Sequence, residues 1–179
     1  SPYRFYQFWI NQADADTPRW LRFFTFLTPE EIRELERCLA TEPEKRDAQR
    51  RLAEEVTRLV HGEEAVQDAV RASQAMFGGE LAGLDDATLE EVFSEVPSHD
   101  LAWSTLSGER PLVDVLVECG VFASKGEARR MIQSGGLYLN NQRVSDQQTK
   151  LTPASLCGRQ IVVVRKGKKD YHLLRFPKP

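Results

Sequence analysis

Apolar positions over residues 1–96 recur at intervals of three and four, which is the spacing of one face of an α-helix. The pattern predicts helices that begin at Pro2 and that cover residues 28–39, 47–60, 63–77 and 85–95. Ser1 suits the cap of the first helix, and Thr28 with Glu31 forms a capping box before the second. We therefore expect residues 1–96 to form an all-α domain.

After residue 96 the pattern changes twice. Residues 97–109 are rich in Pro, Ser and Gly and are expected to be a linker. The elements predicted after the linker are helices over 111–119 and 124–133, a hairpin over 137–144, and strands over 161–164 and 171–176. Asn140 and Asn141 can supply the positive φ angles of a tight hairpin turn. Residues 110–179 are therefore expected to form a second, small α+β domain.

The charge is distributed as unevenly as the secondary structure. Residues 1–108 hold 11 Lys/Arg and 21 Asp/Glu, a net charge of −10, whereas residues 109–179 hold 13 and 6, a net charge of +7. The total of −3 for the chain conceals this difference. A basic half of this kind indicates a module that binds a polyanion.

The cations of the basic half gather in two places. The helix predicted over 124–133 carries Lys125, Arg129 and Arg130 near a capped N-terminus, where phosphate binds well. The turn after the strand at 161–164 carries Arg165, Lys166, Lys168 and Lys169. A solvated basic face, and lysines that discourage pairing between strand edges, are the alternative explanations.

Motifs for catalysis, metal binding and membrane insertion are absent from the sequence. It contains no P-loop, G-x-G-x-x-G or H-E-x-x-H pattern, and its three histidines have no nucleophile or ligand at a useful spacing. The three cysteines are widely separated, which favours a reducing compartment and no zinc site. No apolar run reaches the roughly 18 residues that a membrane span needs. We expect no catalytic residue and no metal site in this chain.

A series of short segments resembles the S4 RNA-binding module. The segments are Pro111-Leu112, Ser124-Lys125, Ala128-Arg129-Arg130, Gly135-Gly136 and Leu137-Tyr138-Leu139-Asn140, in that order. Lys125 and Asn141 stand where arginine and glycine are usual in the module. Because the module occurs in several protein classes, this resemblance by itself implies RNA binding only.

Three other segments are similar to tyrosyl-tRNA synthetases of the bacterial and organellar type, which are class I aminoacyl-tRNA synthetases. They are residues 1–27, residues 52–62 and the turn Gly167-Lys168-Lys169-Asp170-Tyr171. The resemblance implies an anticodon-binding helical domain over 1–96 and an S4-like domain over 110–179. It also implies that the catalytic domain, which uses ATP and Mg²⁺ and forms the homodimer interface, precedes Ser1. The chain alone is then expected to hold no cofactor and to be inactive.

The expected role is to hold tRNA(Tyr) by its anticodon stem-loop and long variable arm during ATP-dependent tyrosylation. The resemblance implies that Asp14 or Asp16 accepts hydrogen bonds from the first anticodon base, a guanine, and that Asp170 does so for the second. The residues expected to contact phosphates are Lys125, Arg129, Arg130, Lys166, Lys168 and Lys169, with Asn140 and Arg143 as weaker candidates.

Two other functions stand as alternatives to this role. A stand-alone S4-module protein, associated with ribosomes or intron splicing, is disfavoured by the synthetase-like segments within residues 1–62. An RNA-modifying enzyme would need a catalytic aspartate motif, which residues 1–96 lack. The bacterial cytoplasm is the preferred location, with the mitochondrial matrix as the alternative, and no membrane partner is expected.

Overall fold

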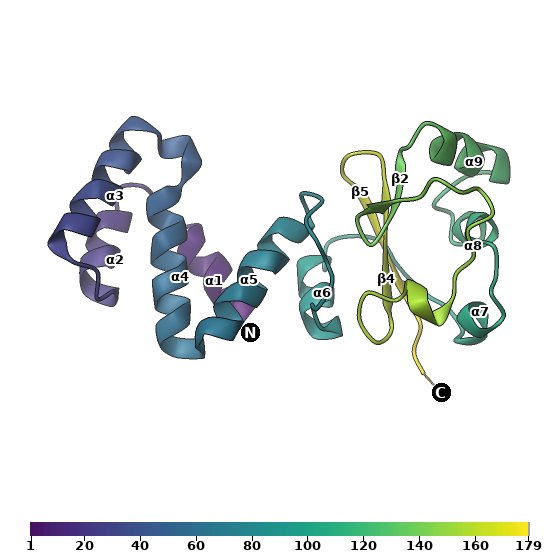
Figure 1. Ribbon diagram of the computed structural model, residues 1–179, viewed down its shortest axis with the longest axis horizontal. Coiled ribbons are helices and arrows are strands. Elements are labelled where there is room, and N and C mark those ends of the chain that lie inside the picture. The colour runs from purple at the N-terminus through teal and green to yellow at the C-terminus, as the bar shows by residue number, and fades with distance from the viewer. Residues whose placement is uncertain (179) are drawn as a thin grey trace. The chain divides into compact units, whose positions relative to one another are not determined.

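The computed structural model describes residues 1–178, which divide into two compact units. The first unit is Ser1–Ser73 and the second begins at Gln74. The first contains helices only, whereas the second combines helices with a five-stranded mixed sheet (Figure 1). The expected change from helical to mixed structure along the chain is therefore confirmed.

The first unit is built around one long helix, α4. Its elements are α1 (Pro2–Ile10), α2 (Thr17–Phe24), α3 (Pro29–Thr41), the short 3₁₀ turn η1 (Pro43–Lys45), α4 (Asp47–His61) and the greater part of α5 (Glu63–Ala75). Helices α1, α2 and α3 all pack against α4. Leu52 of α4 is fully buried with Leu21 and Ile32, as expected for the apolar face of an amphipathic helix.

The predicted helix caps are present. Ser1 accepts a hydrogen bond from the Arg4 amide, at 3.3 Å. In α3 the hydroxyl of Thr28 accepts from the Glu31 amide, and the Glu31 carboxylate accepts from the Thr28 amide at 2.8 Å. This reciprocal pair is the complete capping box that the sequence predicted.

The aromatic residues near the N-terminus divide between the core and the surface. Tyr6 is buried, and Trp9 packs edge-on to Phe5. In contrast, the large aromatic side chains of Phe8, Phe23, Phe24 and Phe26 are exposed to solvent. The core of the first unit therefore accommodates only part of this aromatic cluster.

The second unit contains all the strands of the described chain. Its helices are α6 (Asp86–Val92), α7 (Ser104–Ser107), α8 (Leu112–Glu118), α9 (Lys125–Gln133) and the 3₁₀ turn η2 (Pro153–Ser155). Its strands are β1 (Ser98–Asp100), β2 (Leu137–Leu139), β3 (Gln142–Arg143), β4 (Ile161–Lys166) and β5 (Asp170–Arg175). The strand order is β1-β5-β4-β2-β3, with β1 parallel to β5 and all other neighbours antiparallel.

Helices cover both faces of this sheet. Val162, Val164 and Leu174 on one face join a buried core with side chains of α8 and α9. On the other face the Tyr171 ring lies 5.3 Å from that of Phe93, which follows α6. Figure 1 shows α8 and α9 on one side of the sheet and α6 on the other. Burial on both faces fixes the sheet within the second unit.

The structure corrects the expected linker at 97–109. Residues 98–100 form β1, whose flanking carbonyl, that of Pro97, accepts from the Leu173 amide at 2.9 Å, and residues 104–107 form α7. Trp103, between them, packs against the core of the second unit. The segment Ser-His-Asp is short and polar, so its backbone pairing leaves no alternating pattern in the sequence. Residues 74–96, expected in the helical domain, also cluster with the second unit.

Candidate nucleic-acid interface

Two contacts bring the cations of α9 close to the turn between β4 and β5. The Gly167 amide in the turn donates to the carbonyl of Gly136, just after α9, at 2.7 Å. The Lys166 ammonium lies 3.2 Å from Oε1 of Glu127 in the first turn of α9. The two cation groups predicted from the sequence therefore belong to one part of the second unit.

Four of these cations are available to a ligand. We call Arg129, Arg130, Lys168 and Lys169 the basic surface; all four are exposed, and none has an ion-pair partner within residues 1–178. Glu127 interacts with Arg130 at longer range, but none of the four is held in an ion pair in the part of the chain that the structure describes, so together they attract polyanions and repel each other.

The other two predicted phosphate ligands are partly engaged within the protein. Lys125 pairs with Asp114 at 2.9 Å. The Lys166 side chain is only 26% exposed; it contacts Glu127 and the Val121 carbonyl and lies over the Phe122 ring. This geometry favours a structural role for Lys166, in which it ties β4 to α9.

The N-terminus of α9 is occupied by its own carboxylate. Ser124 accepts from the Glu127 amide at 3.2 Å, and the Glu127 carboxylate accepts from the Ala123 amide at 3.0 Å. The Ala123 hydrogen bond, with a further contribution from Lys166, lowers the pKa of Glu127. A phosphate at these amides would have to displace a carboxylate, so the available positive charge is that of the basic surface.

A row of alternating arginine and tyrosine residues crosses the sheet beside this surface. Tyr138 on β2 pairs with Arg143 on β3 and with Arg165 on β4, and Arg165 pairs with Tyr171 on β5. The Arg165 guanidinium lies 3.7 Å from the centre of the Tyr138 ring, a close cation–π contact. Arg143 is exposed and its guanidinium lies against Gly135. This row was not predicted from the sequence, although alternate residues of each strand share a face of the sheet and could have indicated it.

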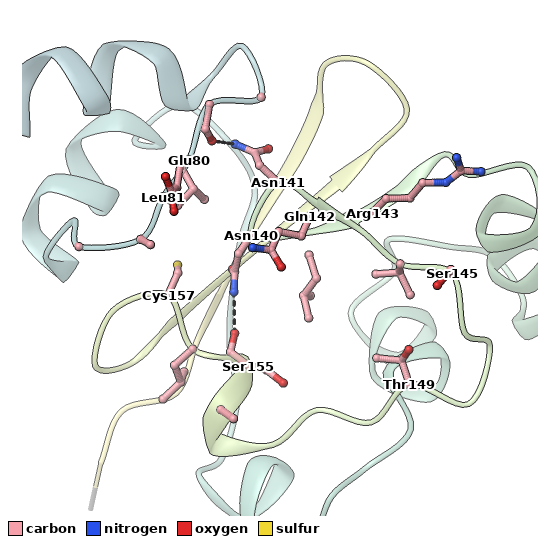
Figure 2. Close-up of a pocket in the computed structure, with 18 of the residues that line it drawn as sticks. Glu80, Leu81, Asn140, Asn141, Gln142, Arg143, Ser145, Thr149, Ser155 and Cys157 are labelled. Atoms are coloured by element: carbon pink, nitrogen blue, oxygen red, sulfur yellow. Dashed lines mark hydrogen bonds between the residues drawn. The ribbon is translucent and has the colours of Figure 1, made fainter.

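Asn140 and Asn141 have structural roles at one wall of an open groove (Figure 2). Both have positive φ, 50° and 62°, as the hairpin prediction requires. The Asn140 amide donates to the Ser155 carbonyl at 2.7 Å and accepts from the Val163 amide at 2.9 Å. Both ends of the Asn140 side chain are thus used inside the fold, which disfavours its predicted RNA contact.

The predicted base-reading carboxylates lie in both units. Asp14 accepts from Nε2 of Gln49 at 2.6 Å and lies 3.8 Å from the Arg46 guanidinium. Asp16 is at the N-cap of α2, exposed and without a capping hydrogen bond. Asp170 is exposed in the second unit, with Oδ1 3.2 Å from Nε2 of His172. Within the first unit, Asp16 is therefore freer to meet a base than Asp14.

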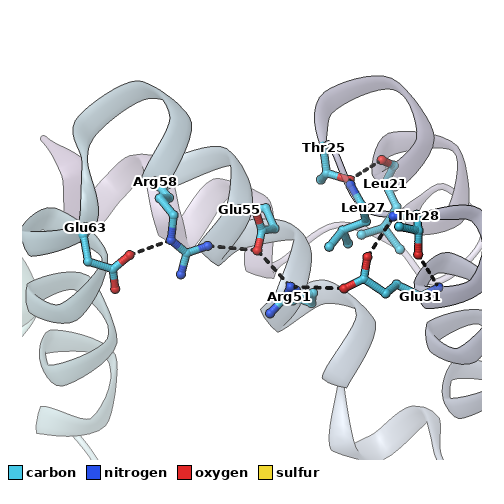
Figure 3. Close-up of polar contacts among 9 residues, drawn as sticks. All are labelled: Leu21, Thr25, Leu27, Thr28, Glu31, Arg51, Glu55, Arg58 and Glu63. Atoms are coloured by element: carbon cyan, nitrogen blue, oxygen red, sulfur yellow. Dashed lines mark hydrogen bonds and ion pairs between the residues drawn. The ribbon is translucent and has the colours of Figure 1, made fainter.

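Charged residues of the first unit compensate each other. Arg51 and Arg58 on α4 alternate with carboxylates of α3, α4 and α5 in a continuous row (Figure 3). Glu55 lies within the row, 2.9 Å from Arg58 and 3.2 Å from Arg51. Because each arginine has two carboxylates, this row stabilises helix packing and is a poor anion site.

Other kinds of site are not found within residues 1–178. Those residues contain no cluster of three or more His, Cys, Asp or Glu side chains arranged to hold a metal ion. None of the helices in that part of the chain has the length and apolar character of a membrane span. Burial raises the pKa of the Cys157 thiol to about 11, which makes it a poor nucleophile at neutral pH.

Comparison with known families agrees with the synthetase resemblance at both ends of the chain. Residues 1–78 match the family described as tRNA synthetases class I (W and Y). Residues 88–174 match the family described as the tyrosine–tRNA ligase SYY-like C-terminal domain. The two matches follow each other along the chain and cover most of it.

Curated relatives of this chain are tyrosine–tRNA ligases. The chain is 50% identical over 177 residues to a tyrosine–tRNA ligase of Roseiflexus castenholzii, which is 98% of this chain and 42% of that protein. It is 49% identical over 178 residues to the enzyme of Geobacillus kaustophilus, covering 98% and 41%. The chain thus spans about two fifths of the length of the curated relatives it matches.

A solved structure, described as the solution structure of a tyrosyl-tRNA synthetase C-terminal domain, is 38% identical to this chain. The match covers the whole of that structure and 57% of this chain, with a TM-score of 0.44. The two family matches and the curated relatives show that this chain corresponds to the C-terminal region of the tyrosine–tRNA ligase family.

Proposed function

We propose that this chain is the tRNA-binding part of a tyrosine–tRNA ligase. It would hold the anticodon stem-loop and long variable arm of tRNA(Tyr), so that the 3′ end reaches a tyrosine-activating domain elsewhere in the enzyme. The observation that carries the proposal is the basic surface, in which Arg129, Arg130, Lys168 and Lys169 share one region and form no ion pair within residues 1–178. Its contribution to catalysis is affinity and positioning.

In this proposal the cations and the carboxylates have different tasks. The basic surface contacts phosphates, which gives affinity that is independent of sequence. Asp16 or Asp14 reads the guanine at the first anticodon position, and Asp170 reads the second base. Because a carboxylate repels phosphate, an exposed aspartate in an RNA-binding region is suited to the donor edge of a base.

We assign the finer layout on the same basis. The first unit would act as the anticodon-binding domain, and the sheet with α8 and α9 as an S4-like domain. ATP and Mg²⁺ would bind the remainder of the ligase, which would also supply a homodimer interface, and this chain would hold neither. Bacterial relatives support a location in the cytoplasm.

A stand-alone S4-module protein is the second candidate function. It would use the same basic surface but would need no contribution from residues 1–73. The match of residues 1–78 to class I tRNA synthetases supports the ligase proposal instead.

The test is to measure binding of this chain to tRNA(Tyr), and to a tRNA without the tyrosine anticodon and long arm, at two salt concentrations. The chain should prefer tRNA(Tyr), and its affinity should fall steeply with salt. Lys168→Ala/Lys169→Ala should weaken binding to both RNAs and reduce the log–log salt slope by roughly 0.7–0.9 for each phosphate that the variant no longer binds.

The matched control is Lys150→Ala/Lys178→Ala, which removes the same charge from the same unit. Lys150 pairs with Glu109 and Lys178 lies over Trp103, so neither belongs to the basic surface. Equal weakening in the two double variants would contradict a defined phosphate site. Equal binding of both RNAs would favour the stand-alone RNA-binding function.

A further inference from the structure

His99, His172 and Asp170 form a hydrogen-bonded row from the edge strand β1 to the start of β5, beside the turn between β4 and β5. Nε2 of His99 lies 3.4 Å from Nδ1 of His172, and Nε2 of His172 lies 3.2 Å from Oδ1 of Asp170. The two rings stack with their centres 5.6 Å apart. The His172 side chain is 13% exposed and that of Asp170 is 55% exposed, so a nearly buried ring holds an accessible carboxylate.

The proton positions in this row follow from its geometry. With both rings neutral, Nε2–H of His172 must donate to Asp170, because the carboxylate only accepts. Nδ1 of His172 is then an acceptor and receives Nε2–H of His99. The titratable groups around His172 are Asp170 on its own strand, His99 on β1 and Lys166 on β4. Burial is the largest of several influences that lower the pKa of His172, and the ring is therefore neutral above about pH 6.5.

In this arrangement Oδ1 of Asp170 accepts a hydrogen bond from His172, and Oδ2 is available to a ligand. An exposed carboxylate at a turn otherwise exchanges among rotamers, and binding would have to order it. The hydrogen bond from Nε2–H of His172 orders the Asp170 carboxylate before RNA binds. Because a neutral imidazole adds no positive charge beside the carboxylate, Oδ2 remains a strong acceptor.

We propose that His172, oriented by His99, is a positioning residue that fixes the Asp170 carboxylate to accept a hydrogen bond from an N–H group on a base edge of bound RNA. The proposal rests on the proposed function, because it requires Asp170 to meet an anticodon base. It adds the two histidines, which link β1 to Asp170 beside the turn between β4 and β5.

The chemistry of a fixed acceptor predicts which base it selects. Opposite position 3 of the base, uracil presents N3–H as a donor, whereas cytosine presents a lone pair that repels a carboxylate. The N4–H₂ donor of cytosine lies at a different point on the edge, so a carboxylate fixed opposite N3 is poorly placed to accept from it. The tyrosine anticodon is G-U-A, with uracil in the second position. A positioned Asp170 should therefore discriminate uracil from cytosine at that position.

The experiment compares the affinity of the full chain for a tRNA(Tyr) transcript and for the same transcript with G-C-A in the anticodon. The proteins are the unmodified chain, Asp170→Asn, His172→Leu and His172→Gln. We expect Asp170→Asn to reduce the preference for uracil by about tenfold. His172→Leu should reduce it by about three- to tenfold, since it removes one hydrogen bond to a charged group.

The conservative variant separates positioning from packing. In His172→Gln the amide nitrogen takes the place of Nε2, so it can still donate to Asp170 and should retain most of the preference. The control is His61→Leu, which replaces a histidine of α4 in the first unit that contacts Phe5. It should leave the preference unchanged. Circular dichroism checks that each variant folds.

A spectroscopic readout tests the row without RNA. Nitrogen chemical shifts of the imidazole rings should show His172 as the neutral Nε2–H tautomer between pH 7 and 8. In His99→Leu the proton should stay on Nε2, because Asp170 still accepts it, but the Nδ1 resonance should move to the value of a nitrogen that accepts no hydrogen bond from His99. An Nδ1–H tautomer of His172 in the unmodified chain would overturn the proposal.

The binding outcomes distinguish the two proposals. If the unmodified chain shows no preference, or Asp170→Asn leaves it intact, base reading by Asp170 fails and the positioning role fails with it. If Asp170→Asn removes the preference but His172→Leu keeps it, the positioning role alone is overturned. Equal reduction in His172→Leu and His172→Gln would also overturn it, because that result indicates packing.

Discussion

At the scale of single residues, the Asn141 side chain joins three segments of the second unit. Its amide nitrogen donates to the carbonyls of Ala75 and Gly79, at 2.9 and 2.8 Å. Its oxygen accepts from Nε of Arg165 at 3.1 Å and from the Tyr171 hydroxyl at 3.4 Å. One turn residue thereby attaches the segment at 75–79 to the sheet.

We predict that Asn141→Gly destabilises the protein. Glycine tolerates the φ of 62° but removes every side-chain hydrogen bond, so the free energy of unfolding should fall by about 1–3 kcal/mol. The midpoint of urea unfolding measures this change. Glu109→Gly is the matched control, because Glu109 also has positive φ, 49°, at an exposed site. That variant should be neutral or slightly stabilising; an unchanged midpoint in Asn141→Gly would contradict the role of its amide.

A second residue-scale prediction concerns pH. The pKa of His172 in the folded protein lies below its ordinary value of 6.5, chiefly because of burial. Between the two values the unfolded chain binds more protons, so the contribution of His172 to stability is complete above about pH 6.5 and diminishes as the pH falls toward the folded pKa. Thermal unfolding should show that His172→Gln loses less stability than the unmodified chain between pH 7 and 5. An equal loss of stability in the two proteins between pH 7 and 5 would contradict this role of His172.

At the scale of elements, local signals decide how well the sequence predicts structure. The helix α3 begins where Thr28 and Glu31 predicted, because a capping box is a contact between residues three positions apart. The helix α2, of eight residues, and the strand β1, of three, are not in the prediction. Both are short, and β1 exists only through its backbone pairing with the distant strand β5. No local pattern encodes such a pairing.

The capping box of α3 gives a prediction at this scale. Thr28→Ala removes the acceptor for the Glu31 amide and should reduce the free energy of unfolding by about 1 kcal/mol. Thr28→Ser keeps the hydroxyl and should be nearly neutral. Urea unfolding of the three proteins tests this, and equal stability of Thr28→Ala and Thr28→Ser would show that the box contributes little.

At the scale of the whole molecule, the division of the chain differs from the one expected. Composition suggested a boundary at 97–109, but residues 74–96 cluster with the sheet. Phe93 and Leu89 are buried there, and Asn141 bonds to the backbone at Ala75 and Gly79. A helix-forming sequence does not reveal which of two cores its apolar face will join.

This division predicts how shortened chains behave. Residues 74–178 should fold independently, whereas residues 97–178 would expose the sheet face around Tyr171 and should melt at a lower temperature. Thermal unfolding followed by circular dichroism, with binding of an apolar dye, compares the two. Equal melting temperatures would indicate that residues 74–96 add little to the core of the second unit.

The sequence predicted which residue types belong to the candidate site better than it predicted the contacts that those residues make. Clusters such as Lys168-Lys169 are visible in the sequence, and the structure leaves both side chains exposed. The pairing of Lys166 with Glu127 and the internal bonding of Asn140 depend on segments that meet only in the folded state. The row of His99, His172 and Asp170 was missed for the same reason, since β1 itself was missed.

The position of β5 in the sheet also affects how the protein is made. This strand lies between β1 and β4, although it follows β1 by about 70 residues along the chain. During synthesis, β1 therefore has no partner until residue 175 has left the ribosome. Until then, β4 presents an open edge and its apolar faces to the cell. A pause in translation before this strand would extend the time in which the nascent second unit needs a chaperone.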